Sequence, residues 1–155
     1  MIMNFSLVGD RILLTLWVGA LWAIGYIAAP ILFTVLDDRQ LAGKLAGEMF
    51  HIVSYIGLVS GIFLLVSVLK RMGLQWRAWV LIVMLVLVAT GEFVLQPMME
   101  SLKLQGLIEG SEAKKQFGML HGIASTLYML ESLLGLALVT AGLSASSLMK
   151  KNQTG

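Results

Sequence analysis

The sequence predicts an all-α integral membrane protein, an up-down-up-down bundle of four helices in one transmembrane domain. Three observations support this fold class. Of the 155 residues, 58% are hydrophobic and only 13% are charged, whereas soluble domains carry about 25% charged residues. Mean hydropathy is +0.88, which favours lipid as the solvent. The apolar runs are also too long for strands and lack the alternation of a β-barrel.

Composition excludes several other classes. The net charge of +2 does not indicate nucleic-acid binding, because the basic residues flank apolar runs instead of clustering with aromatic residues. The absence of cysteine excludes disulfides, thiolate metal ligands and thiol nucleophiles. The signatures of soluble enzymes, such as a phosphate-binding loop or a G-x-S-x-G elbow, are absent as well.

The first span is predicted over residues 12–36, an uncharged run that is long enough to cross a hydrocarbon core of about 30 Å. We expect it to be a retained anchor, because no Lys or Arg precedes Arg11 and the run exceeds a signal-peptide core. Pro30 is expected to kink or end the regular helix. Residues 37–48 are predicted to form a loop with a short interfacial helix.

The second span is predicted over residues 49–69, where Gly57 and Gly61 form a small-xxx-small pair that permits close helix contact. After a basic turn, the third span covers residues 78–96 and ends at Pro97. Because the loops are short, consecutive helices should run antiparallel.

The fourth span is predicted over residues 117–149, after a polar loop of residues 100–116. It contains two titratable side chains, His121 and Glu131, which are costly in lipid unless they face protein, a partner or water.

Loop charge predicts the orientation. The basic residues of one side are Arg11, Lys70, Arg71, Arg77, Lys150 and Lys151, and those of the other are Arg39, Lys44, Lys103, Lys114 and Lys115. The first group sits in very short segments at the membrane edge, where the positive-inside rule applies. We therefore expect both termini in the cytoplasm of a bacterial inner membrane.

This topology places several polar residues at one depth, in the outer half of the bundle. His51 begins the second span, His121 begins the fourth, and Glu92 lies near the end of the third. Tyr55 follows His51 by one helical turn, as Ser125 follows His121, so each pair shares a helix face. The predicted ligand-binding cluster is His51, Glu92, His121, Tyr55, Gln96, Ser125 and Trp22.

Three interpretations of this cluster compete. In the first, the polar groups only satisfy one another between helices. In the second, the cluster binds a ligand, with His51 and His121 holding haem iron or copper and Glu92 orienting one imidazole. In the third, the cluster is part of a proton or ion path.

Copper has one specific pattern in its favour. Met49 and His51 repeat the Met-x-His spacing of Met119 and His121, and thioether with imidazole suits Cu(I). However, residues two apart do not share a helix face, so each pair chelates only if its helix start is unwound. Methionine is otherwise an ordinary filler of apolar cores.

Aromatic residues of the first span suggest a second kind of ligand site. Trp17, Trp22 and Tyr26 fit a stacking box for a ring-shaped ligand such as a quinone, but Trp17 with Trp76 or Trp79 fits an interfacial belt about as well. The favoured function is non-enzymatic, the binding or passing of a small ligand or ion at the cluster. The alternatives are a haem-bearing membrane oxidoreductase and a scaffold subunit of a complex. Besides lipid, the expected partner is a second copy that associates through glycine-rich helix faces.

Short motifs carry a family resemblance over most of the chain. They are Trp17-x-Gly19-x-x-Trp22, Pro30-x-Leu32-Phe33, Ala42-Gly43, Met49-Phe50 with Tyr55, Gln96-Pro97-Met98-Met99 and Phe117-x-x-x-His121-Gly122-x-x-Ser125. The chain resembles the bacterial domain-of-unknown-function 4149 family and the related eukaryotic transmembrane-protein-205-like proteins. This resemblance implies a small four-helix membrane protein of unassigned biochemistry. In architecture and histidine placement alone, the chain is also similar to small membrane proteins of the copper-resistance and haem-biosynthesis oxidase type.

Overall fold

The computed structural model describes residues 2–142, and its side chains from Leu7 onward. This part of the chain contains helices and no strand, so the all-α prediction is confirmed. Within it, four helical paths are long and apolar enough to cross a membrane. They are Leu7–Val35, Arg39–Met72, Trp76–Leu104 and Glu112–Ala141.

The first path is one helix with an interruption. α1 (Ile2–Ala23) continues through a five-residue π-helix, η1 (Ile24–Ala28), into α2 (Ala29–Val35). Pro30 lies in the first turn of α2. Proline has no backbone N–H, so it removes one hydrogen bond from a continuous α-helix. The wider π-helical turn just before Pro30 accommodates the missing hydrogen bond. The proline therefore interrupts the regular α-helix without ending the span.

The second path differs from its predicted boundaries. α3 (Arg39–Met72) is a single helix of 34 residues, and the stretch expected to be a loop with a separate interfacial helix is its first part. The Asp38 side chain caps this helix by accepting hydrogen bonds from the backbone N–H groups of Gln40 and Leu41, at 2.8 and 3.1 Å. Since neither proline nor a second cap follows, the helix runs without a break to Gly73, which has a φ of 69°.

The third path repeats the interruption of the first. α4 (Trp76–Thr90) continues through η2 (Gly91–Leu95) into α5 (Gln96–Leu104). Pro97 was expected to end the span, but it lies in the first turn of α5 and the helix continues beyond it. Glu92 therefore lies near the middle of this path rather than near its end.

The fourth path, α6 (Glu112–Ala141), begins five residues before the predicted start. The Ser111 hydroxyl accepts a hydrogen bond from the Lys114 backbone N–H at 3.2 Å and caps the helix. Residues 143–149 of the predicted span lie outside the described residues.

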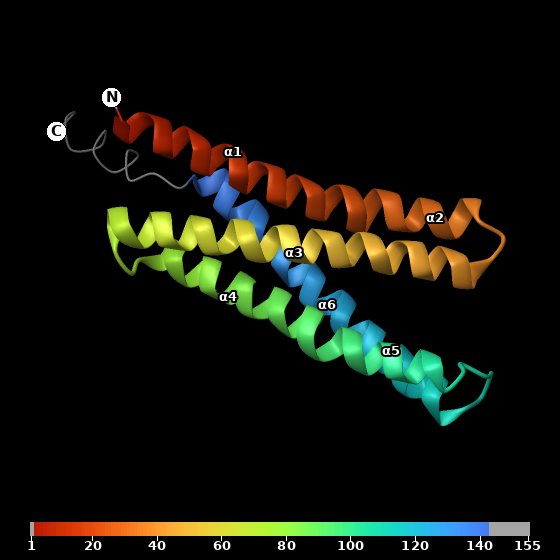
Figure 1. The fold of residues 1–155 in the computed structure, drawn as a ribbon. Coiled ribbons are helices and arrows are strands. Elements are labelled where there is room, and N and C mark those ends of the chain that lie inside the picture. Colours follow the sequence, from red (N-terminus) through yellow and green to blue (C-terminus); the bar gives the residue numbers. More distant parts are fainter. Residues whose placement is uncertain (1, 143–155) are drawn as a thin grey trace.

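Figure 1 shows the helices as two pairs. α1 and α2 lie beside α3, α5 lies beside α6, and α4 packs against both α3 and α6, with short connections that turn the chain back on itself. We call the end that holds the 36–38 and 105–111 connections the tip, and the opposite end, with Asp10 and the 73–75 turn, the base. At the tip the two connections lie far apart, so the pairs diverge (Figure 1).

The main core lies where α1, α3, α4 and α6 meet. Its fully buried side chains include Trp17, Leu64, Leu81, Met84 and Leu138. A smaller cluster of Leu95, Met99, Leu102 and Leu120 joins α5 to α6 near the tip. Most other large apolar side chains face outward, as expected for helices whose solvent is lipid.

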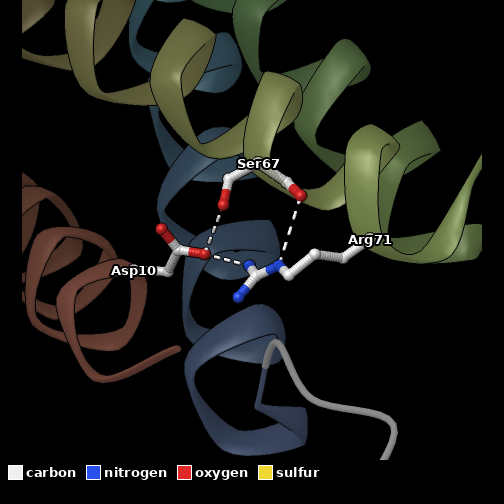
Figure 2. A network of polar contacts seen from close by, with 3 residues as sticks. All are labelled: Asp10, Ser67 and Arg71. Carbon is white, nitrogen blue, oxygen red and sulfur yellow. Dashed lines mark hydrogen bonds and ion pairs between the residues drawn. The ribbon is translucent and has the colours of Figure 1, made fainter. Parts of the chain in front are cut away.

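A polar network ties α1 to α3 at the base (Figure 2). The Asp10 carboxylate forms an ion pair with the Arg71 guanidinium and accepts a hydrogen bond from the Ser67 hydroxyl at 2.7 Å. Arg71 Nε donates to the Ser67 carbonyl at 3.2 Å. The two charged side chains are 14% and 20% exposed, so the network is largely shielded.

A second charged contact lies at the same end, on the other helix pair. Arg77 is 6% exposed. Its Nε donates to the Gly142 carbonyl at 2.8 Å, and its guanidinium lies 5.0 Å from the centre of the Trp76 ring. Each pair is therefore joined at the base by a charged residue of its first helix.

Candidate functional site

An acid–base contact between His51 on α3 and Glu92 on η2 joins the two helix pairs. His51 Nδ1 pairs with Glu92 Oε1. The histidine side chain is 49% exposed, whereas that of the glutamate is only 4% exposed. The pair therefore joins a shielded carboxylate to an imidazole that the surroundings of the protein can reach.

Aromatic rings fix the orientation of this imidazole. Tyr55 lies one turn along α3, and its ring meets the His51 ring edge-on at 4.8 Å. The Tyr55 ring in turn contacts Phe93, the neighbour of Glu92, at 6.4 Å. The same two segments, α3 and η2, are thus joined by the imidazole–carboxyl contact and by an edge-to-face aromatic contact.

The other members of the predicted cluster make no hydrogen bond, ion pair or ring contact with His51 or Glu92 in the described part of the chain. His121 stacks on Phe117, with the rings 6.0 Å apart, and its carbonyl accepts a hydrogen bond from the Ser125 hydroxyl at 2.8 Å. Both His121 and Ser125 are exposed. Gln96 is half-buried at the start of α5. No contact between the two imidazoles is found in residues 2–142.

Trp22 belongs to a separate aromatic cluster between α1, η1 and α6. Its Nε1 donates to the Ser132 carbonyl at 3.3 Å, and its ring lies 4.8 Å from that of Tyr26. The Tyr26 hydroxyl hydrogen-bonds the Ser132 hydroxyl at 2.7 Å. The Tyr128 hydroxyl donates to the Leu21 carbonyl at 2.7 Å. These rings pack against one another and bond to backbone and side-chain groups of the same chain.

The proposed metal ligands are not gathered in one place. Met119 is 62% exposed, and Met49 is half-buried on α3. Within the described part of the chain, no three His, Asp or Glu side chains form a set that could hold a metal ion. α3 and α6 are regular helices where Met49 and Met119 precede the histidines, so each Met-x-His pair faces two directions.

Two features of the site were not predicted from the sequence. The first is the π-helical form of η1 and η2, one of which carries Glu92; the glycine and proline near each segment are the signal that could have revealed it. The second is the burial of Glu131. Its side chain is in the core, at 5% exposure, and its Oε1 atom has no hydrogen-bond partner.

Comparison with known proteins identifies the family. The family model for a domain of unknown function, DUF4149, matches residues 12–107, which is more than half of the chain and includes both π-helical segments. No curated protein and no solved structure matches the chain. On the strength of the family match, the chain belongs to the DUF4149 family of proteins.

Proposed function

We propose that this membrane protein binds a proton at the His51–Glu92 pair and passes it across the bilayer. The observation that carries this proposal is the unequal exposure of the pair, 49% for the imidazole side chain and 4% for the carboxylate side chain. An exposed group that touches a shielded one is the arrangement required to load an internal acceptor from outside.

The chemistry of the pair favours a proton over other small ligands. Imidazole and carboxylate both exchange protons, and histidine is the side chain whose charge changes most readily near neutral pH. Nδ1 faces Glu92, which leaves Nε2 on the other side of the ring to take up or release a proton. A metal ion would need further ligands, and residues 2–142 place no third His, Asp or Glu there.

Location in the fold supports the same function. Ionisable residues inside a membrane bundle are costly, and those that face its interior commonly belong to ion pathways or proton relays. Glu92 lies in a π-helix, an irregular segment that is frequent at functional sites. It also joins the two helix pairs, so a change in its charge acts on the contact between them.

The orientation of the path is part of the proposal. Basic residues at the base, including Lys70 and Arg77, favour a cytoplasmic position for that end under the positive-inside rule. His51 lies nearer the tip than the base along α3, so in this orientation a proton reaches it from the outer face of a bacterial inner membrane.

A flux measurement tests this function. Purified protein is reconstituted into lipid vesicles that contain a pH-sensitive dye, with potassium and valinomycin to compensate charge, and an external acid pulse is applied. The wild-type protein should acidify the interior faster than empty vesicles, and Glu92→Gln should abolish the difference. Glu100→Gln is the matched control, because Glu100 is exposed and, among residues 2–142, pairs with Lys103 alone. Wild-type flux equal to that of empty vesicles would reject the proposal.

A further inference from the structure

The two helix pairs are versions of one repeated unit. In each, a helix is interrupted by a π-helix of five residues, followed by a proline in the first turn of the next helix and then by a long return helix. The π-helices start at Ile24 and Gly91, which are 67 positions apart. Pro30 and Pro97 are also 67 positions apart.

Packing around two glycines shows that the units are related by a pseudo-two-fold axis. A Cβ atom added to Gly61 would meet Trp17 and Leu85, whereas one added to Gly135 would meet Met84 and Val18. Met84 lies 67 positions after Trp17 and Leu85 lies 67 positions after Val18, while the two glycines are 74 positions apart. Exchanging the two units therefore turns the contacts of Gly61 into those of Gly135, and the contacts of Gly135 into those of Gly61.

The base follows the same rule. Asp10 and Arg77 are 67 positions apart, and each contacts the end of the return helix in its own unit, through Arg71 and the Gly142 carbonyl respectively. In membrane proteins built from repeats, binding sites lie where the repeats meet.

The acidic residues break this symmetry. Glu92 occupies the position of Gly25, at the offset of 67, and Glu131 occupies the position of Gly57, at the offset of 74. The first unit therefore forms the same helices with glycine at both places. Because the fold does not require a carboxyl group at either position, the two carboxyl groups of the second unit need another explanation.

Glu131 has the surroundings of a proton-binding group. It is 5% exposed, and no ion pair to it is found in residues 2–142. Its Oε1 atom is buried without a hydrogen-bond partner, as is the indole Nε1 of Trp17, whose ring packs on Gly57, the counterpart of Glu131. An unpaired carboxylate is very unfavourable in such a place, whereas a protonated carboxyl group is not.

A proton fits this position better than a metal cation. The nearby hydroxyl groups already have partners, since Tyr128 donates to the Leu21 carbonyl and Ser132 bonds to Tyr26 and to the Met129 carbonyl. Hard cations need several oxygen ligands, and one free carboxyl oxygen does not supply them. α6, which carries Glu131, also packs against η2, which carries Glu92.

We propose that Glu131 is a second proton-binding position, internal to the His51–Glu92 pair on the same path. The step is a proton transfer alone: the proton leaves one carboxyl group and adds to the next, with no change of oxidation state. The role of Glu131 in a proton path rests on the proposed function. The inference that the Glu131 carboxyl group is protonated does not.

Infrared spectroscopy of the reconstituted protein reads that proton directly. A protonated carboxyl group buried in protein gives a C=O stretching band separate from the ionised, exposed carboxylates. We expect this band in the wild type and in Glu100→Gln, and its loss in Glu131→Gln. Glu131→Asp keeps a carboxyl group at this position and should retain the band at a shifted frequency. This variant tests the inference even if the glutamine variant does not fold. An unchanged band in a folded Glu131→Gln would overturn the inference.

The flux assay separates failure of this inference from failure of the proposed function. Flux that is lost in Glu92→Gln and also in Glu131→Gln supports both. Flux that is lost in Glu92→Gln but survives in Glu131→Gln overturns the second position and leaves the first. A Glu131 band in a protein without flux rejects the path and leaves Glu131 as a proton-binding group.

Discussion

Replacing Gly57 by alanine tests the packing at the centre of the bundle. A Cβ atom at this position would lie 2.5 Å from Trp17 Nε1 and 3.0 Å from Cε2 of the same ring. The indole is rigid and only 1% exposed, so it cannot move aside without displacing the core. Overpacking of this kind typically costs about 1–3 kcal/mol.

Gly19 provides the matched control. It lies on α1, and a Cβ atom added there meets nothing within 4 Å. Alanine is favoured over glycine inside a helix by about 0.5–1 kcal/mol, so Gly19→Ala should be neutral or slightly stabilising. The two substitutions make the same chemical change inside a helix, so the helix-propensity gain cancels and we expect the variants to differ in stability by about 1–3 kcal/mol.

The free energy of unfolding is measured for both variants by titrating denaturing detergent into protein held in mild micelles, with helix content as the signal. Gly57→Ala should unfold at a lower denaturant fraction than the wild type, and Gly19→Ala should not. If both variants match the wild type, the indole does not pack on Gly57 and the arrangement of α1 against α3 is wrong.

Three other predictions concern the base, the orientation and the aromatic cluster. Asp10→Asn removes the charged partner of Arg71 and should lower the free energy of unfolding by about 1.5–3 kcal/mol. A variant as stable as the wild type in the same titration would refute the network of Figure 2. Because the chain has no cysteine, Lys103→Cys should react with an impermeant thiol reagent on intact cells and Lys70→Cys only after permeabilisation; the reverse pattern would invert the topology. Tyr128→Phe loses one hydrogen bond, at 2.7 Å, and should cost about 1 kcal/mol; no loss of stability would show that this bond does not form.

Hydropathy predicted the class and the number of spans, but not where the helices end. The stretch before His51 contains alanine, glycine and charged residues, and was expected to be a loop with a short interfacial helix instead of the first part of the spanning helix. It is helical because Asp38 caps it and because Ala42 and Ala46 are buried. Hydropathy indicates which residues lie within the hydrocarbon core of the membrane. The residue at which a helix begins is determined by its cap and by local packing.

The candidate site was predicted in part. His51, Glu92 and Tyr55 were expected to lie together, and the structure joins them. His121 was expected in the same cluster, but it follows the buried Leu120, and adjacent helical residues point about 100° apart. The rotation of each helix about its axis depends on packing with its neighbours, which approximate span boundaries do not determine.

The internal repeat was not visible in the sequence because few residues match between the two units. Leu14 and Leu81 match at the offset of 67, as do the prolines, and Gly61 matches Gly135 at the offset of 74. Packing constrains the size and burial of a side chain more than its identity, so the two units share contacts without sharing many residues.

Nitrogen NMR of histidine-labelled protein in lipid bilayers tests the central claim, that Glu92 holds the imidazole of His51. The chain has only two histidines, so His121→Gln assigns both sets of ring signals. Glu92→Gln should shift the ring nitrogens of His51 and leave those of His121 unchanged. Ring signals of His51 that stay in place would contradict the pair, and with it the path that begins there.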